Sequence, residues 1–172
     1  CTHNGLAIRF DESDARAMGR NASGVKGISL ADDDAVVAMV KADDERQLLT
    51  ICVNGYGKCT AMSEYLVQPE QGAPYPQKRG GKGRVDIRTT ARNGKVVTAM
   101  SVTDTDQAML ITEAGMIVRT AVSEISTVGR GTQGVRVINL KQDDKLVAAA
   151  AVSVESASED DAEDQATAPP KD

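Results

Sequence analysis

The chain has 172 residues, of which 41% are hydrophobic and only 2% aromatic, so its core must consist of aliphatic and methionine side chains. Three cysteines do not fit a disulfide framework and favour a reducing compartment. The formal net charge of −5 conceals a segregation of charge: residues 153–172 hold seven acids and one lysine, whereas residues 77–95 hold seven cations and one acid. The negative net charge of the whole chain therefore does not exclude an anionic partner.

The sequence repeats itself. Residues 5–40 align without a gap with residues 115–150, and residues 36–65 align with residues 96–125. A repeat of about 50–60 residues is in the range of propeller blades. We expect three units, at about 1–34, 35–94 and 95–154.

In the first unit, Asn4-Gly5 predicts a hairpin turn, and residues 13–18 favour a single helical turn. A loop with the sequence M-G-R-N-A-S-G follows at 18–24. This unit lacks the pair of apolar strands that precedes the hairpin glycine of each later unit. Because the chain also begins at Cys1, we expect a C-terminal piece of a longer protein, with about two and a half repeats.

In the second unit, apolar runs predict strands at 36–40 and 48–53, followed by the hairpin turn Asn54-Gly55. A proline-containing insertion then leads to the loop Q-K-R-G-G-K-G at 77–83. We expect a further hairpin turn at Asn93-Gly94.

In the third unit, we expect strands at 96–102, 108–112 and 146–152, with V-G-R-G-T-Q-G at 128–134 in the loop position. Short strands with evenly spaced turns indicate an all-β, propeller-like fold of antiparallel strands, covering 1–154. Residues 155–172 are acidic and lack large apolar side chains, which predicts a disordered tail.

The loop at 77–83 combines three cations with three glycines. Glycine permits a sharp turn and a close approach, so the cations can face one polyanion such as a nucleic-acid backbone. Because the loop recurs at one position of the repeat, we expect a basic rim that contacts DNA phosphates. The predicted contacts are Gln77, Lys78, Arg79, Gly80, Gly81, Lys82, Gly83 and Arg84, with Arg20, Lys26, Arg130 and Arg136 in the other loops.

Three further cations follow hairpin glycines, namely Arg9, Lys58 and Arg119. They fit either rim contacts or ion pairs within the sheets, and both interpretations stay open at this point.

The sequence offers no catalytic or metal-binding constellation. It has one histidine, and Cys52 and Cys59 have no further cysteine or histidine nearby, which disfavours zinc. The acidic clusters at 32–34 and 143–144 occupy aligned positions and are expected to form turns. Four aromatic residues cannot build a stacking platform for single-stranded nucleic acid, so duplex DNA is the favoured ligand.

The loop at 77–83 resembles the gyrase box, Q-R-R-G-G-K-G, which belongs to the C-terminal domain of the A subunit of bacterial DNA gyrase. The same resemblance extends to N-G-Y-G-K at 54–58, V-S-E-I-S at 122–126 and G-R-G-T-Q-G-V-R at 129–136. It implies a six-bladed β-pinwheel whose blades exchange strands and whose basic rim wraps duplex DNA. This chain would hold part of that pinwheel.

The resemblance also implies a role in a type II topoisomerase. The holoenzyme would contain two A and two B subunits and use ATP and Mg²⁺ to introduce negative supercoils. The fragment itself would hold no cofactor and no catalytic residue, and the protein would be cytoplasmic, associated with the bacterial nucleoid and not with a membrane.

Two alternatives remain from sequence. One is the matching subunit of topoisomerase IV, which serves decatenation; the other is a propeller that binds proteins. Lys78 stands where the box usually has arginine, and this box lies in a late blade and not in the first. The sequence before Cys1 would separate the two topoisomerases.

Overall fold

The computed structural model describes residues 1–153, and within this range the secondary structure consists of β-strands and short 3₁₀ turns. The all-β prediction is confirmed. The acidic tail predicted for residues 155–172 lies outside the described range. The strands are β1 (Leu6–Ala7), β2 (Gln47–Cys52), β3 (Tyr56–Ala61), β4 (Arg84–Val85), β5 (Val96–Val102), β6 (Gln107–Thr112), β7 (Ile117–Ala121), β8 (Val135–Arg136) and β9 (Leu146–Val152), and the turns are η1 (Glu12–Asp14), η2 (Met62–Tyr65) and η3 (Val122–Glu124).

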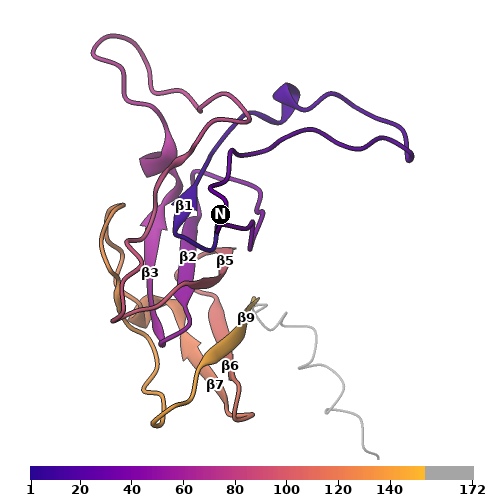
Figure 1. Cartoon of the computed structure of the whole chain (residues 1–172). Coiled ribbons are helices and arrows are strands. Elements are labelled where there is room, and N and C mark those ends of the chain that lie inside the picture. Colours follow the sequence, from indigo (N-terminus) through magenta and orange to yellow (C-terminus); the bar gives the residue numbers. More distant parts are fainter. Residues whose placement is uncertain (154–172) are drawn as a thin grey trace, which may run out of the picture.

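The strands form two larger sheets and one short pair (Figure 1). The sheet order is β5-β2-β3-β8 in the middle of the chain and β7-β6-β9 at its end, with β1 paired to β4. The hairpins β2–β3 and β6–β7 turn at Gly55 and Gly115, whose φ angles are 77° and 82°. The outer strands of the two sheets also pair in the same way. β5 pairs with β2, and β9 pairs with β6, each with an irregularity at the aligned position of the inner strand.

Each short strand pairs with the unit that precedes it. β4, from the loop of the second unit, pairs with β1, and β8, from the loop of the third unit, pairs with β3. A Cβ on Gly83 would lie 2.7 Å from the carbonyl oxygen of Ala7, and one on Gly134 would lie 2.6 Å from that of Gly57. The loop glycines are therefore required for the close approach that exchanges strands between units.

The main core joins the two larger sheets. Leu49 and Ile51 of β2 pack in one cluster with Leu110 of β6, Leu146 of β9 and Val122 of η3. All five are buried, and complete burial of each such side chain contributes about 1.5–3 kcal/mol. The cluster contains no aromatic side chain, as the composition predicts.

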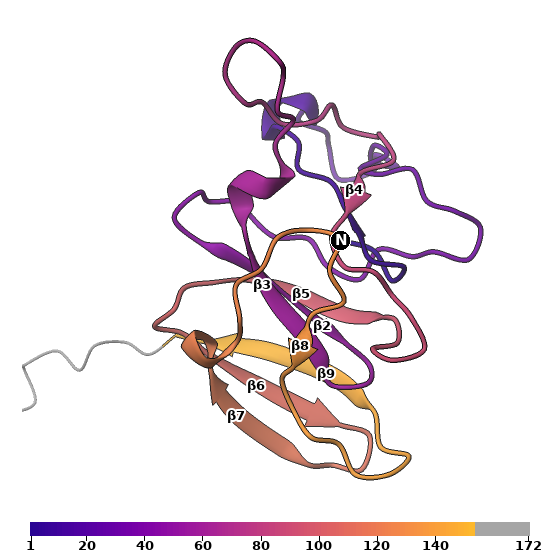
Figure 2. The ribbon, with the colours of Figure 1, turned by 90° about the vertical axis from the view of Figure 1, so that its left-hand side faces the viewer.

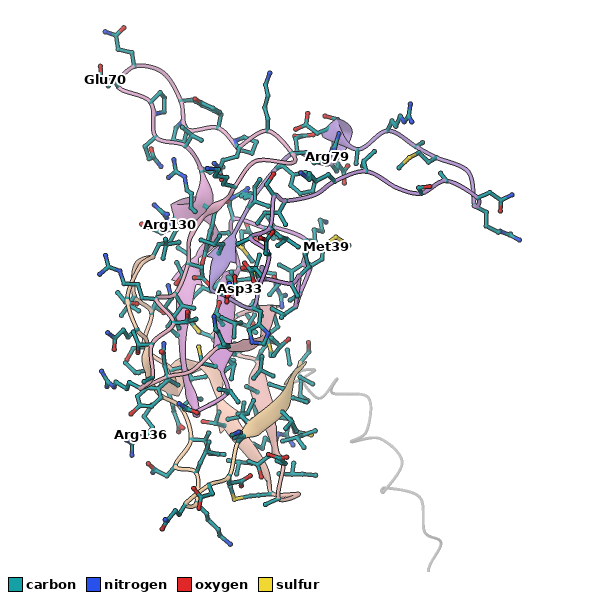
Figure 3. The ribbon with its side chains drawn as sticks, viewed as in Figure 1. Asp33, Met39, Glu70, Arg79, Arg130 and Arg136 are labelled. Atoms are coloured by element: carbon teal, nitrogen blue, oxygen red, sulfur yellow. The ribbon has the colours of Figure 1, made fainter. Side chains whose placement is uncertain are left out.

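The predicted strand at 36–40 is wrong: only Val36 is bridged, to Thr2. The aligned strands β5 and β9 pair with β2 and β6. Beyond that bridge, the segment bonds to Cys1, whose backbone N donates to Ala38 O at 2.9 Å and whose O accepts from Val37 N at 3.0 Å. Met39, at 90% exposure, shows how open this segment is (Figure 3).

Two predicted turns also differ from the structure. The helical turn expected at 13–18 is the 3₁₀ turn η1. Asn93-Gly94 does not join two paired strands; it lies in a turn that precedes β5. The amide of Asn93 is buried and bonds to other backbone groups, which sets the shape of this turn in place of hairpin pairing.

The acidic clusters form turns, as predicted. The carboxylate of Asp34 accepts from the backbone N of Asn4, and that of Asp144 accepts in the same way from Ala114. Burial opposes ionisation of both carboxyls, but these hydrogen bonds outweigh it and lower the pKa of each below 3.8.

Candidate nucleic-acid interface

The three glycine-containing loops lie side by side, each against the one before it. We call residues 18–29 the first loop, 77–88 the second loop and 128–139 the third loop. Between the first two, the backbone N of Gly80 donates to Gly27 O at 2.8 Å, and that of Ser29 donates to Gly81 O at 2.8 Å.

The second and third loops repeat this contact. The backbone N of Gly131 donates to Asp86 O at 2.7 Å, and that of Arg88 donates to Thr132 O at 2.8 Å. In Figure 2 the third loop crosses in front of β3 and carries β8. The sequence predicts that the loops share one structural position. In the structure, they form a continuous row along one edge of the sheets.

The arginines of the second and third loops, Arg79 and Arg130, each bond to the loop before their own. Arg79 donates from Nη1 to Lys26 O at 2.6 Å and from Nε to Asp14 O at 2.9 Å. Arg130 donates from Nη1 to Val85 O at 3.4 Å, and Val85 is the residue that aligns with Lys26. Much of the donor capacity of these two arginines is therefore used to keep the loops in register.

The lysines of the second loop are differently placed. Lys78 and Lys82 are exposed, and neither takes part in an ion pair within residues 1–153. Arg84, on β4, is half-buried and equally lacks a carboxylate partner there. These cations are available to an external anion. Gln77 is bound through its backbone, whose N donates to Arg9 O at 2.9 Å.

The first loop projects from the sheets, as the indigo segment at the upper right of Figure 1 shows. Arg20 is exposed on it. Lys26 is exposed too, with its ammonium 3.3 Å from the Ser29 hydroxyl.

Of the three cations that follow hairpin glycines, Arg9 forms an ion pair. Its Nη1 lies 2.6 Å from the Asp44 carboxylate and 3.0 Å from Met62 O. Arg119 is exposed on β7 and has no ion pair within the described range. For Arg9, the structure therefore supports the interpretation as an ion pair. Arg119 remains a predicted DNA contact.

For Lys58 the structure supports the ion pair and rules out the rim contact, so its candidacy as a DNA contact is wrong. Its side chain is 0% exposed, and its Nζ lies 3.1 Å from Asp86 and 2.8 Å from Thr60. The same ammonium donates to Gly129 O at 3.1 Å, directly before Arg130. Lys58 lies between Gly57 and Cys59 on β3, and this local sequence gave no signal that the exchanged loops would cover the strand.

Asp86 is the centre of this buried network. It also accepts from the hydroxyls of Thr50 at 2.7 Å and Tyr65 at 2.6 Å. Burial, and then the negative charge of Asp86, raise the pKa of the Tyr65 phenol. The network joins β2, β3, η2 and two loops below the rim.

Sequence analysis did not assign Arg92 or Tyr56 to the interface. The guanidinium carbons of Arg92 and Arg136 lie 4.8 and 5.5 Å from the centre of the Tyr56 ring. Arg136 also donates to the phenol oxygen at 2.9 Å. Arg92, and then Arg136, lower the pKa of this phenol. The clustering of cations at 77–95 was the only available signal, because the contact joins residues 80 positions apart.

Within residues 1–153, no group of three or more histidine, cysteine, aspartate or glutamate side chains could hold a metal ion. Burial raises the pKa of the Cys52 thiol to about 12 and that of Cys59 to about 11, so neither is a nucleophile at neutral pH. Among the described residues, no helix has the length and apolar character needed to cross a bilayer.

Repeated sheets that exchange short strands, with a row of cationic loops along one edge, define a repeat domain of the β-propeller class. A family model described as the DNA gyrase C-terminal domain, beta-propeller, matches residues 1–43, 76–103 and 106–153. The chain belongs to this family, which confirms the resemblance found in the sequence.

Curated relatives agree. The A subunit of DNA gyrase from Salmonella typhimurium is 48% identical over 143 residues, which are 83% of this chain and 15% of that protein. The corresponding Staphylococcus aureus protein is 40% identical over 168 residues, or 96% of this chain and 18% of that protein. The chain thus spans less than a fifth of the length of either relative.

Solved structures show the same fold. A DNA gyrase A C-terminal domain superimposes with a TM-score of 0.75 at 28% identity, covering 87% of this chain and 48% of that one. The C-terminal domain of DNA topoisomerase IV gives a TM-score of 0.77 at 25% identity, covering 88% and 45%.

Proposed function

We propose that the chain is part of the A subunit of a DNA gyrase, and that it binds and wraps duplex DNA along its row of loops. The observation that carries this proposal is the repeated docking of one loop on the next. This docking brings the second loop, which carries Lys78 and Lys82, against the third loop, which carries Arg130 and Arg136, and within residues 1–153 neither lysine forms an ion pair. Figure 3 shows Arg130 and Arg136 on one side of the molecule, opposite Met39.

The chemistry of the row suits phosphates and not bases. The loops are short turns stiffened by backbone bonds, and they present lysine and arginine without a helix or ribbon that would enter a groove. Because adjacent loops are fixed in register, they can follow one continuous strand of phosphates. A series of such contacts along the row would bend the duplex around the domain.

In the whole protein, this wrapping would feed a segment of DNA to a catalytic core. We propose a holoenzyme of two A and two B subunits, which uses ATP and Mg²⁺ to introduce negative supercoils in the bacterial cytoplasm. The described residues contribute binding and curvature, and the chemistry belongs to other parts of the assembly.

Topoisomerase IV is the second candidate, because the topoisomerase IV domain fits the chain with a TM-score as high as that of the gyrase domain. The curated gyrase relatives, at up to 48% identity, favour gyrase. A reconstituted enzyme that supercoils relaxed DNA supports the first candidate, and one that only decatenates supports the second.

The direct test is binding of the full chain to duplex and single-stranded DNA of equal length. We expect preferential binding to the duplex. We also expect Lys78→Ala/Lys82→Ala to weaken it and to reduce the slope of log K against log salt by about 1.8, since each phosphate contact contributes about 0.9.

Lys41→Ala is the matched control, because Lys41 is exposed and lies outside the three loops. A wild-type chain that does not bind duplex DNA, or a double variant that binds like the control, contradicts the proposal. Capture of a protein partner in place of DNA would favour the protein-binding propeller.

A further inference from the structure

Two arginines from different units meet at one tyrosine. Arg92 belongs to the turn before β5, whereas Arg136 is the last residue of β8 in the third loop. Tyr56 begins β3, and its ring lies within 4.8 and 5.5 Å of the two guanidinium carbons. Both arginines are exposed, whereas the tyrosine is only 8% exposed. The buried ring therefore packs beneath two cations that face outward.

The turn that carries Arg92 is fixed by a buried amide. Asn93 is 0% exposed, and its side-chain N donates to Arg88 O at 2.9 Å and to Gln133 O at 3.1 Å. Its side-chain O accepts from the backbone N of Thr90 at 2.8 Å. The amide therefore ties the turn to the third loop, which carries Arg136.

A second asparagine fixes the same turn from the hairpin side. Asn54 donates from its side chain to Ala91 O at 3.1 Å and to Arg92 O at 3.2 Å. Asn54 lies two residues before Tyr56, at the β2–β3 turn. The tyrosine ring and both arginines are thus held by contacts that exist without any ligand. This reduces the entropic cost of ordering the site when a ligand binds.

The cluster carries positive charge without compensation. Neither Arg92 nor Arg136 takes part in an ion pair within residues 1–153, and the only polar side-chain partners of Arg136 there are the Tyr56 phenol and Asn139. Two guanidiniums brought together over one ring repel each other, and a bound anion relieves this repulsion. Guanidinium forks match phosphate oxygens in geometry.

We propose that Arg92 and Arg136, positioned on Tyr56, form a further phosphate-binding site for the backbone of duplex DNA, at the junction of the second and third units. The inference rests on the proposed function and extends it, because Arg92 and Tyr56 lie outside the glycine-containing loops. Arg136 lies two residues after Gly134, so the site continues the row. Arg92 and Arg136 contact phosphate, and Tyr56 is a positioning residue.

The test measures binding of the full chain to duplex DNA over a range of KCl concentrations. Arg92→Ala and Arg136→Ala should each reduce the slope of log K against log salt by about 0.9. Tyr56→Phe keeps both cations and the ring, so we expect the wild-type slope with an affinity about two- to fivefold lower, from the lost hydrogen bond to an exposed cation. Lys41→Ala remains the control for the loss of one surface charge.

The outcomes separate the inference from the function on which it rests. If the two arginine variants keep the wild-type slope while Lys78→Ala/Lys82→Ala loses it, this site is refuted and the proposed function stands. If the wild-type chain does not bind duplex DNA, both are refuted. A Tyr56→Phe variant with wild-type affinity overturns the positioning role. Arg92→Gln and Arg136→Gln, of similar length, serve where an alanine variant does not fold by circular dichroism.

Discussion

The buried pair of Lys58 and Asp86 gives a sharp prediction of stability. Lys58 is 0% and Asp86 1% exposed, and the two charged groups lie 3.1 Å apart. Removing one partner leaves the other charge buried and unpaired, which costs about 3–5 kcal/mol. Because domains of this kind are stable by only about 5–15 kcal/mol, either single change should remove a large part of the free energy of unfolding.

The magnitude follows from the remaining partners. In Lys58→Met, Asp86 keeps the hydroxyls of Thr50 and Tyr65, so its carboxylate stays partly satisfied. In Asp86→Asn, Lys58 keeps Thr60 and a backbone carbonyl but loses its counter-charge. We therefore expect Asp86→Asn to be the more destabilising of the two.

The assay is urea unfolding of the wild type, both single variants and the double variant Lys58→Met/Asp86→Asn. Because the double variant buries no unpaired charge, its loss should be smaller than the sum of the two single losses by about 1–3 kcal/mol, the range expected for residues in contact. Additive losses would refute the reasoning, as would single variants as stable as the wild type.

Three further predictions concern other parts of the fold. Cys52 and Cys59, with thiol pKa values of about 12 and 11, should resist a thiol-specific reagent at pH 8 and react only in urea, unlike the partly exposed Cys1; rapid labelling of Cys52 or Cys59 in the native chain would show that they are not buried. The pKa values of Asp34 and Asp144 are lowered in the folded chain, so their stabilisation is complete above the ordinary value of 3.8 and is lost as the pH falls through the lower folded value. When the pH is lowered below 3.8, the unfolding midpoint should therefore fall less steeply in Asp34→Asn/Asp144→Asn than in the wild type. Identical pH profiles would contradict this. Arg79→Lys keeps the charge but loses the fork that holds the first loop, so amide hydrogen exchange in that loop should accelerate while the core is unchanged; wild-type exchange would show that the arginine does not hold the loop.

The repeat was the strongest signal in the sequence. Short apolar runs predicted β5 and β9 with their observed bounds, and Asn54-Gly55 predicted a hairpin whose glycine has positive φ. These features depend on local patterns that recur in each unit. The segment at 36–40 carries the same pattern and is not a strand: within residues 1–153 only Cys1 and Thr2 pair with it, which is too short a partner for a ladder.

The candidate site was less accessible to sequence analysis. Lys58 and Lys78 are both lysines in glycine-containing segments, yet one is buried under an exchanged loop and the other is exposed. Tyr56 meets Arg136 only because β8 pairs with β3, a contact between residues 80 positions apart. The sequence indicated where cations are concentrated, whereas strand exchange determines which of them face outward.

The central claim is that the row of loops holds double-helical phosphate. The most direct measurement is the affinity of the full chain for duplex DNA as a function of salt. The account predicts a straight line of log K against log salt whose negative slope is at least about 3.6, corresponding to contacts from Lys78, Lys82, Arg92 and Arg136 at about 0.9 each. An affinity that does not change with salt would contradict it.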